Sequence, residues 1–336
     1  MKGFFVRLTI AAGLLGNLGA AEWVRAGLTT NQPIWGLQGG LQFAIHPGGF
    51  RGRDGGPRGL IRLGYPVLTN GTYDLVNFIA VEPVVKGRRG FSELERSPLD
   101  GAAGKRFWVT NSPSARPGSL PAEAGELSRP AAGVERLSVT LAVEPFDHGA
   151  HARVVVSQRS DAPDELRLTL RAEPESAPLD YCILTATMGN MARARQLWLA
   201  NELVSSRQLY PDYKGTGFAP HAVFPLERLR VTPAGDVLVA LTTDELDPAA
   251  VFPFPGTRRW YYGGAKVTQY WLKPKGAFRD DLQAVVNARH TYWQSAQPIP
   301  GGVAFENFEL RERFYDGQRF VFGITLRTPA QLGFKQ

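Results

Sequence analysis

The stretch 165-ELRLTLRAE-173 carries the pattern that decides the fold. In an extended chain its leucines at 166, 168 and 170 fall on one face, and the polar residues between them fall on the other. The stretch 136-RLSVTLAVE-144 repeats the pattern with apolar residues at 137, 139, 141 and 143. Alternation of this kind predicts half-buried strands. Similar segments occur at 152–159, 236–244, 265–273 and 319–327.

Many such segments, bounded by Gly, Pro and Asp and not separated by clear helices, predict an all-β protein. We therefore expect a large antiparallel β-sandwich of two layers with few or no helices. Two stretches, 191–206 and 278–293, contain good helix formers but also strand-like centres. The first is predicted to be a strand, and the second is left open.

The first 21 residues have the organisation of a secretory signal peptide. Two basic residues, at 2 and 7, precede an apolar run and a group of small residues that ends at Ala21. The sequence thus predicts export to the periplasm or beyond the cell, with Glu22 as the first mature residue. No later run approaches the roughly 18 apolar residues of a membrane span, so none is expected in the mature chain.

Residues 22–336 are expected to form a single large sandwich domain, with two fused sandwiches as the alternative. The stretch 111–133 is rich in Pro, Ser, Ala and Gly and poor in large apolar residues. It predicts a surface excursion from that domain. The lone cysteine, Cys182, stands among apolar residues, which is typical of a buried thiol.

The charge gives a weak indication about partners. The full chain carries +7, and loss of the signal peptide leaves 36 basic against 31 acidic residues, or +5. Because the arginines are scattered and no basic run occurs, nucleic acid is not an expected partner. The balance is compatible with an anionic polysaccharide or with solubility alone.

Known catalytic signatures are absent from the sequence. There is no GxSxG, HExxH, Walker loop, paired CxxC or dinucleotide fingerprint, so no cofactor is predicted. Asp147, His148 and His151 are close enough in sequence to be metal ligands. They follow a predicted strand beside a glycine, as an ordinary polar turn would, and no metal site is predicted.

Aromatic residues gather in 258-RRWYYGGAKVTQYW-271 and in 290-HTYW-293. They form either core or a platform on which a sugar ring stacks. In strands some of these rings must point away from a one-sided core, and exposed clusters of this kind mark interaction sites. The predicted substrate-binding rings are Trp260, Tyr261, Tyr262, Tyr270, Trp271, Tyr292 and Trp293.

Two glycine-containing loops supply candidates for β-elimination on an acidic glycan. Tyr213 and His221, in the loop 210–224, are plausible proton-transfer groups. Asn190 and Arg195, with Arg193 as a binding residue, could neutralise a substrate carboxylate. The alternative is that the first loop packs against the sandwich edge and the second caps a strand.

Two carboxylates, Glu306 and Glu309, are the candidates for hydrolysis of a neutral glycan. If 301–314 contains a strand, Glu306 shares a face with Phe308, while Asn307 shares the other with Glu309. The alternative is a solvated outer strand face.

These observations predict an exported carbohydrate-active protein that cleaves an acidic polysaccharide by β-elimination or hydrolysis. The alternatives are a non-catalytic carbohydrate-binding protein and a structural protein of the cell envelope.

Overall fold

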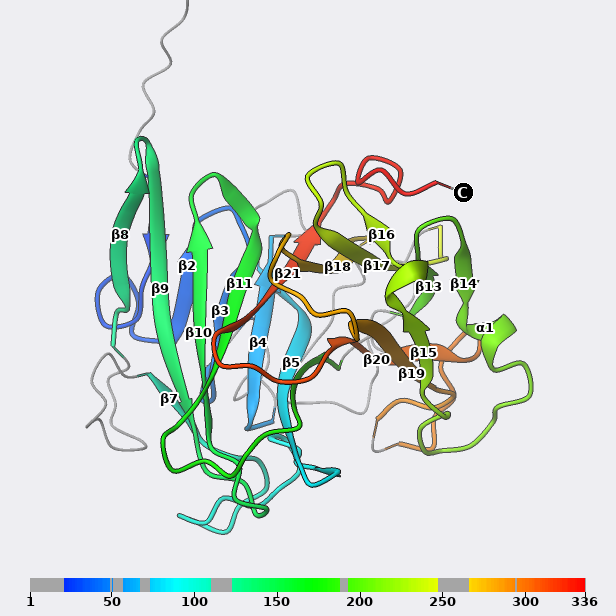
Figure 1. Cartoon of the computed structure of the whole chain (residues 1–336), viewed down its shortest axis with the longest axis horizontal. Helices are drawn as coiled ribbons and strands as arrows, with labels where there is room; N and C mark the ends of the chain where they lie inside the picture. The colour runs from blue at the N-terminus through cyan, green and yellow to red at the C-terminus, as the bar shows by residue number, and fades with distance from the viewer. Residues whose placement is uncertain are drawn as a thin grey trace, which may run out of the picture.

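The computed structural model describes residues 21–48, 50, 57–66, 73–109, 123–187, 193–246, 266–293 and 295–335. Within these ranges the chain forms two large antiparallel sheets, which confirms the predicted two-layer all-β fold (Figure 1). The helical elements of these ranges are α1 (Ser206–Leu209) and a 3-10 turn (Leu226–Arg228).

The first sheet contains the N-terminal strands and four strands from the C-terminal half. In spatial order its described strands are β1 (Trp23–Val24), β2 (Ile34–Leu37), β3 (Gln42–Ala44), β4 (Leu60–Tyr65), β5 (Asp74–Val85), β12 (Tyr181–Ala186), β20 (Ala304–Arg311), β19 (Gln283–Arg289) and β15 (Ala222–Pro225), with β6 (Arg88–Arg89) paired to β5.

The second sheet is built mainly from the middle of the chain. Its described strands are β14 (Leu203–Ser205), β13 (Ala194–Trp198), β17 (Val237–Thr243), β18 (Thr268–Lys273), β21 (Gln318–Thr325), β11 (Ala162–Ala172), β10 (Ala152–Arg159), β9 (Val134–Val143) and β7 (Phe107–Val109), with β16 (Arg230–Val231) paired to β17 and β8 (Glu126–Ala131) paired to β9.

The predicted alternation places the core between the two sheets. The leucines at 166, 168 and 170 of β11 are fully buried, as are Val154 and Val156 of the neighbouring β10. Figure 1 shows the blue strands β2 and β3 behind the green strands β9 and β10. A hydrogen bond of 2.8 Å from the Leu41 backbone N–H to the Pro163 carbonyl joins the two layers at this end.

The two stretches with helix-like composition are strands. Residues 194–198 and 203–205 form the hairpin β13–β14, as predicted, and residues 283–289 form β19. Both are held by sheet neighbours, which outweigh helix propensity. No helix among the described residues has the length and apolarity needed to cross a bilayer.

The structure differs from the prediction in the second part of the stretch 111–133. Residues 126–131 form the edge strand β8, paired with β9, although most of its side chains are exposed. Backbone hydrogen bonds to a neighbour suffice for such a strand, so an apolar pattern is not needed. Residues 110–122 lie outside the described ranges.

Candidate functional site

A pocket of about 420 Å³ lies on the face of the first sheet that is turned away from the core. Its floor includes residues of β5, β19 and β20, among them Phe78, Asn287 and Asn307. The alternate residues of these strands, such as Ile79 and Val286, point into the core between the sheets. A volume of this size is within the roughly 300–1,000 Å³ of small-molecule sites.

A β-bulge in β20 brings two polar side chains into this pocket. Phe305 is opposite Ala288 and Phe308 is opposite Val286, so β20 has one residue more than β19 between these pairs. Both phenylalanines therefore face the core. The two residues between them, Glu306 and Asn307, both line the pocket.

Because of this bulge, β20 does not follow the strict alternation of side chains expected from the sequence. Glu306 does not share a face with Phe308, because the extra residue shifts the phase of the side chains. Glu306, Asn307 and Glu309 all lie on the pocket side of β20. The expected grouping of Asn307 with Glu309 agrees with the structure.

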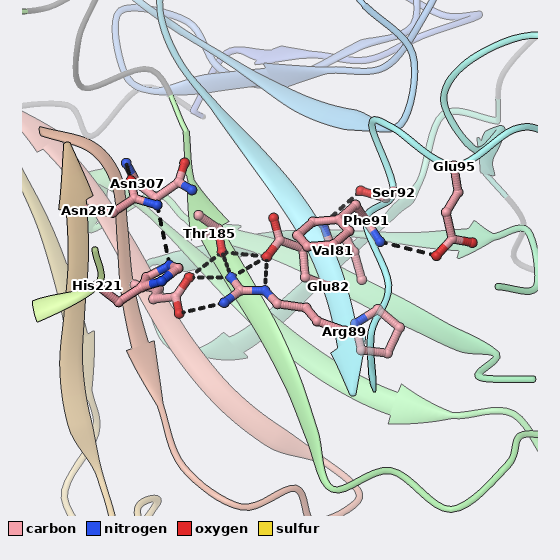
Figure 2. A network of polar contacts seen from close by, with 12 residues as sticks. Val81, Glu82, Arg89, Phe91, Ser92, Glu95, Thr185, His221, Asn287 and Asn307 are labelled. Carbon is pink, nitrogen blue, oxygen red and sulfur yellow. Dashed lines mark hydrogen bonds and ion pairs between the residues drawn. The ribbon is translucent and has the colours of Figure 1, made fainter. Parts of the chain in front are cut away.

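Buried charges form the base of the site, as Figure 2 shows. The Arg89 guanidinium contacts carboxylates from two strands, Glu82 of β5 and Glu309 of β20. Its Nη2 lies 2.6 Å from Glu309 Oε2 and 3.1 Å from Thr185 Oγ1. The Thr185 hydroxyl also donates to Glu309 Oε2 at 2.6 Å. Glu309 is thus fully engaged in holding the strands together.

Burial changes the acidity of two carboxyl groups that line the pocket. It raises the pKa of Glu82 to about 8, although Arg89 opposes the shift. Desolvation likewise raises the pKa of Glu93 to about 7, close to neutrality. Glu93 Oε2 is buried and accepts no hydrogen bond from the described residues. This carboxyl group is therefore able to gain or lose a proton under physiological conditions.

His221 faces this site from a loop beside β19 (Figure 2). Its Nε2 lies 3.3 Å from Nδ2 of Asn287, and an amide Nδ2 can only donate, so Nε2 is the acceptor and is unprotonated. Partial burial holds the pKa of His221 below its usual value; Glu309 opposes this shift, while Arg89 and Arg311 favour it. His221 is therefore neutral near pH 7.

Asn287 also holds the β-bulge of β20 in place. Asn287 Oδ1 accepts the Asn307 backbone N–H at 3.1 Å. The Asn307 side chain retains a buried Oδ1 that has no donor among the described residues. Two residues that line the pocket therefore carry buried acceptors without partners in the described part of the chain, Glu93 Oε2 and Asn307 Oδ1.

Apolar side chains form the rest of the lining. Phe91 and Phe218 are partly exposed, at 36% and 46%, and Trp293 is half-buried. The segment that carries Phe218 is fixed by Arg289, whose guanidinium lies 4.9 Å from the ring and donates to the Thr216 carbonyl. These rings give the pocket flat apolar surfaces beside its carboxylates.

Three of the rings predicted to form a sugar platform are buried, so that part of the prediction is wrong. Trp271 is fully buried and donates to the Phe308 carbonyl, while Tyr270 is 2% exposed and donates to Glu165. Tyr292 is also 2% exposed. Trp271 and Tyr292 pack in the main core, and Tyr270 packs in a second cluster with Phe334 of the C-terminal segment.

The arginines predicted to bind a substrate carboxylate lie elsewhere. Arg193 and Arg195 are buried, and both are bound to Glu245; Arg195 also contacts Asp244 at 3.0 Å. Their charges are thus already compensated at the start of β13. Neither residue lines the pocket.

The remaining candidates divide between the pocket and other places. His221, Trp293 and Glu306 line the pocket. Tyr213 does not; it is partly buried against the core. The other four candidates lie outside the described residues: Asn190, Trp260, Tyr261 and Tyr262.

Several pocket residues were not anticipated from the sequence, namely Glu82, Arg89, Phe91, Glu93 and Asn287. For Glu82 a signal exists, because it is a lone carboxylate within the apolar run 78-FIAVEPVV-85. A charge in a buried strand is retained only with a partner, which often marks a functional region. Glu93 stands in an unremarkable polar segment.

The residues near Asp147 have separate protein partners. Asp147 lies 3.0 Å from Lys105 Nζ, His148 contacts the Pro83 carbonyl, and His151 contacts Glu175. In the described part of the chain, no group of three His, Cys, Asp or Glu side chains is arranged to hold a metal ion.

Comparisons with known proteins show no family. No protein-family model and no curated protein match the chain. Among solved structures, the galactosidase domain of the α-galactosidase-sucrose kinase AgaSK aligns with 93% of this chain and 43% of its own, at 10% identity and a TM-score of 0.41. This chain thus spans less than half the length of that relative.

Two further structures align over most of both chains. A GalM/aldose epimerase homologue from C. elegans covers 86% of this chain and 96% of its own, at 11% identity and a TM-score of 0.28. The protein HI1317 covers 85% and 95%, at 11% identity and a TM-score of 0.22. Similarity this low establishes neither a family nor a reaction for the chain.

Proposed function

We propose that the protein is a carbohydrate-active enzyme that binds a neutral sugar unit in the pocket of the first sheet. The observation that carries this proposal is the pair of buried acceptors without partners, Glu93 Oε2 and Asn307 Oδ1. A buried polar group without a partner costs free energy. A ligand rich in hydroxyl groups would supply the missing donors, and Phe91, Phe218 and Trp293 offer apolar surfaces to the faces of its ring.

The charge of the pocket favours a neutral sugar over an acidic one. Three carboxyl groups line it, from Glu82, Glu93 and Glu306, and Arg89 is its one lining guanidinium among the described residues. That guanidinium is already shared by Glu82 and Glu309. A uronate carboxylate would find no unshared cation among the described lining residues, and its charge would raise the cost of ionising Glu93 and Glu306. This argument favours hydrolysis over β-elimination.

In the proposed hydrolysis, Glu93 is the general acid. A carboxyl group with a pKa of about 7 is substantially protonated near neutrality. It donates its proton to the glycosidic oxygen while the bond from that oxygen to C1 breaks. Glu306 is the second carboxylate and assists the attack of water at C1, taking up the proton that water releases. Glu309 cannot serve, because Arg89 and Thr185 bind its oxygens.

His221 is assigned a binding role in this scheme. As a neutral imidazole with Nε2 held by Asn287, it carries its proton on Nδ1 and can donate to a sugar oxygen there. The Asn287 contact thus sets which imidazole nitrogen is available.

The test uses the mature chain from Glu22 with p-nitrophenyl glycosides of neutral sugars and of glucuronic acid. Release of p-nitrophenol measures hydrolysis, and ultraviolet absorbance on acidic polysaccharides measures β-elimination. Calorimetry with neutral monosaccharides and oligosaccharides measures binding. We expect hydrolysis of a neutral glycoside and a loss of turnover of about 100-fold or more in Glu93→Gln, as expected for removal of a general acid.

Glu95→Gln is the matched control, because Glu95 is two residues away but contacts Lys105 and does not line the pocket. It should retain turnover. Sugar binding without turnover would refute the enzymatic part of the proposal and indicate a non-catalytic carbohydrate-binding protein. Failure of every neutral sugar to bind, or new absorbance from an acidic polysaccharide, would refute the proposal.

Export remains a prediction from the first 21 residues. Fractionation of cells that express the full chain, with sequencing of the mature N-terminus, would test cleavage before Glu22.

A further inference from the structure

A second pocket, of about 270 Å³, lies beside β7 and the segment that leads into β4. Its apolar walls come from residues such as Ile45, Leu60 and Phe107. Its polar lining differs from that of the sugar pocket, because basic side chains from Arg58, Lys105 and Arg106 line it beside one carboxylate, that of Asp100.

Two residues that line this pocket carry buried donors with no acceptor among the described residues, Arg58 Nη2 and Trp108 Nε1. Trp108 is only 8% exposed, so its indole N–H has little access to water. Leaving a buried donor unpaired is costly, and such groups are uncommon in native proteins. A ligand that carries acceptor oxygens would satisfy both.

The backbone holds Arg58 in this position. Its Nη1 donates to Asp100 Oδ2 at 2.8 Å, which leaves Nη2 for another acceptor. The next residue, Gly59, has a φ of +74°, and a Cβ there would lie 1.9 Å from the Ser92 carbonyl oxygen. Any other residue at 59 would be strained and would clash, so this turn requires glycine.

One cation of the lining has no ion-pair partner among the described residues. Arg58 is paired with Asp100, and Lys105 has two acidic partners at 3.0 and 3.1 Å. The guanidinium of Arg106 lines the pocket and makes no ion pair with any residue of the described ranges. This unpaired guanidinium, together with two N–H donors, matches the charge and the two oxygens of a carboxylate.

We propose that this second pocket binds a carboxylate-bearing ligand. Arg58 Nη2 and Trp108 Nε1 donate to the carboxylate oxygens, Arg106 supplies the balancing charge, and the apolar walls contact the ring or chain that carries the group. The proposal does not depend on the function of the sugar pocket. The two pockets lie on either side of the segment 57–60, since Pro57 lines one, Arg58 lines the other and Leu60 lines both.

The test follows the indole N–H signals by NMR while carboxylates are added. The probes are benzoate and D-glucuronate, each compared with an uncharged analogue, benzyl alcohol and D-glucose. Inorganic sulfate is a third anion without an apolar part. The Trp108 signal is identified as the one that is missing from Trp108→Phe, a variant that keeps a ring of similar shape but has no N–H.

We expect at least one carboxylate to shift the Trp108 signal, while its uncharged analogue leaves the signal in place. A response to benzoate alone indicates an apolar carboxylate, and a response to glucuronate indicates a uronic acid. Arg58→Gln should weaken binding by about tenfold or more, the value of one charge-assisted hydrogen bond. If Arg58→Gln does not fold, Arg106→Gln provides the same test on a side chain without ion pairs.

Arg171→Gln is the matched control, because Arg171 is half-exposed and its ion pair within the described ranges is with Asp316. Glu93→Gln should also leave carboxylate binding unchanged, which separates this pocket from the sugar pocket. The proposal is overturned if no carboxylate moves the Trp108 signal at concentrations far above millimolar. It is also overturned if sulfate binds more tightly than both carboxylates, or if Arg171→Gln weakens binding as much as Arg58→Gln.

Discussion

Glu93→Gln should stabilise the protein at alkaline pH while it removes the activity proposed for the pocket. The reason is that the folded chain holds this carboxyl group in a desolvated place, where the charged form is disfavoured. A glutamine has nearly the same shape as the protonated carboxyl group. The variant therefore keeps the packing and avoids the cost of a buried charge.

The size of the effect comes from the difference in pKa between the unfolded and folded states. The pKa of Glu93 rises from 4.5 to about 7 on folding. At about 1.4 kcal/mol per pKa unit, the cost of ionising Glu93 in the folded state reaches about 3 kcal/mol. For a protein of marginal stability, this is a substantial part of the free energy of unfolding.

The sign follows from which state binds the proton more tightly. Because the folded state has the higher pKa, it keeps the proton between pH 4.5 and about 7 while the unfolded state loses it. The contribution of Glu93 to the free energy of unfolding is therefore intact below pH 4.5, falls as the pH rises to about 7, and is constant above that. In Glu93→Gln the free energy of unfolding does not include this decrease, because glutamine does not ionise.

Urea unfolding followed by tryptophan fluorescence at pH 4.5 and pH 8.5 measures the difference. We expect the variant and the wild type to have similar stability at the lower pH, and the variant to be more stable by up to about 3 kcal/mol at the higher pH. Glu95→Gln should instead be destabilising near neutrality, because it removes an ion pair with the buried Lys105. An identical difference between Glu93→Gln and wild type at both pH values would refute the reasoning.

Three other changes test the buried polar contacts. Arg89→Met leaves the two carboxylates of its network without a cation and should cost about 3–5 kcal/mol in urea unfolding. Lys273→Met should cost a similar amount of about 3–5 kcal/mol, because Lys273 and Glu312 form a fully buried pair. The double variant Lys273→Met/Glu312→Leu should recover most of this loss, and no recovery would contradict the pairing. Asn287→Asp replaces the donor at His221 Nε2 by a carboxylate and should raise the histidine pKa from below 6.5 by about one unit or more, as measured by NMR titration; an unchanged pKa would show that the contact is absent.

The main architecture could be predicted from the sequence because alternation is a local property. Each strand of the second sheet that shows it, such as β9, β10 and β11, buries every second side chain against the same core. A strand without an apolar pattern gives no such signal: the side chains of β8 are mostly exposed, and its position depends on backbone pairing with β9.

The candidate site was predicted only in part. His221, Trp293 and Glu306 were selected as residue types that bind or transform sugars, and the pocket contains them. The same criterion selected Trp271 and Arg195, which are buried structural residues. Residue type alone does not show whether an aromatic or basic side chain packs in the core, forms an internal ion pair or binds a ligand.

Period-two patterns and frequent Gly and Pro residues specify short strands wherever they occur, so the class of the fold follows from local sequence. The site depends on tertiary packing. Its acidic groups come from β5, from the segment after β6 and from β20, which are neighbours through strand order rather than sequence. The acidity of Glu93 depends on what covers it, and the direction of Glu306 depends on one extra residue in a strand pair. Both are properties of packing and register, which no single segment contains.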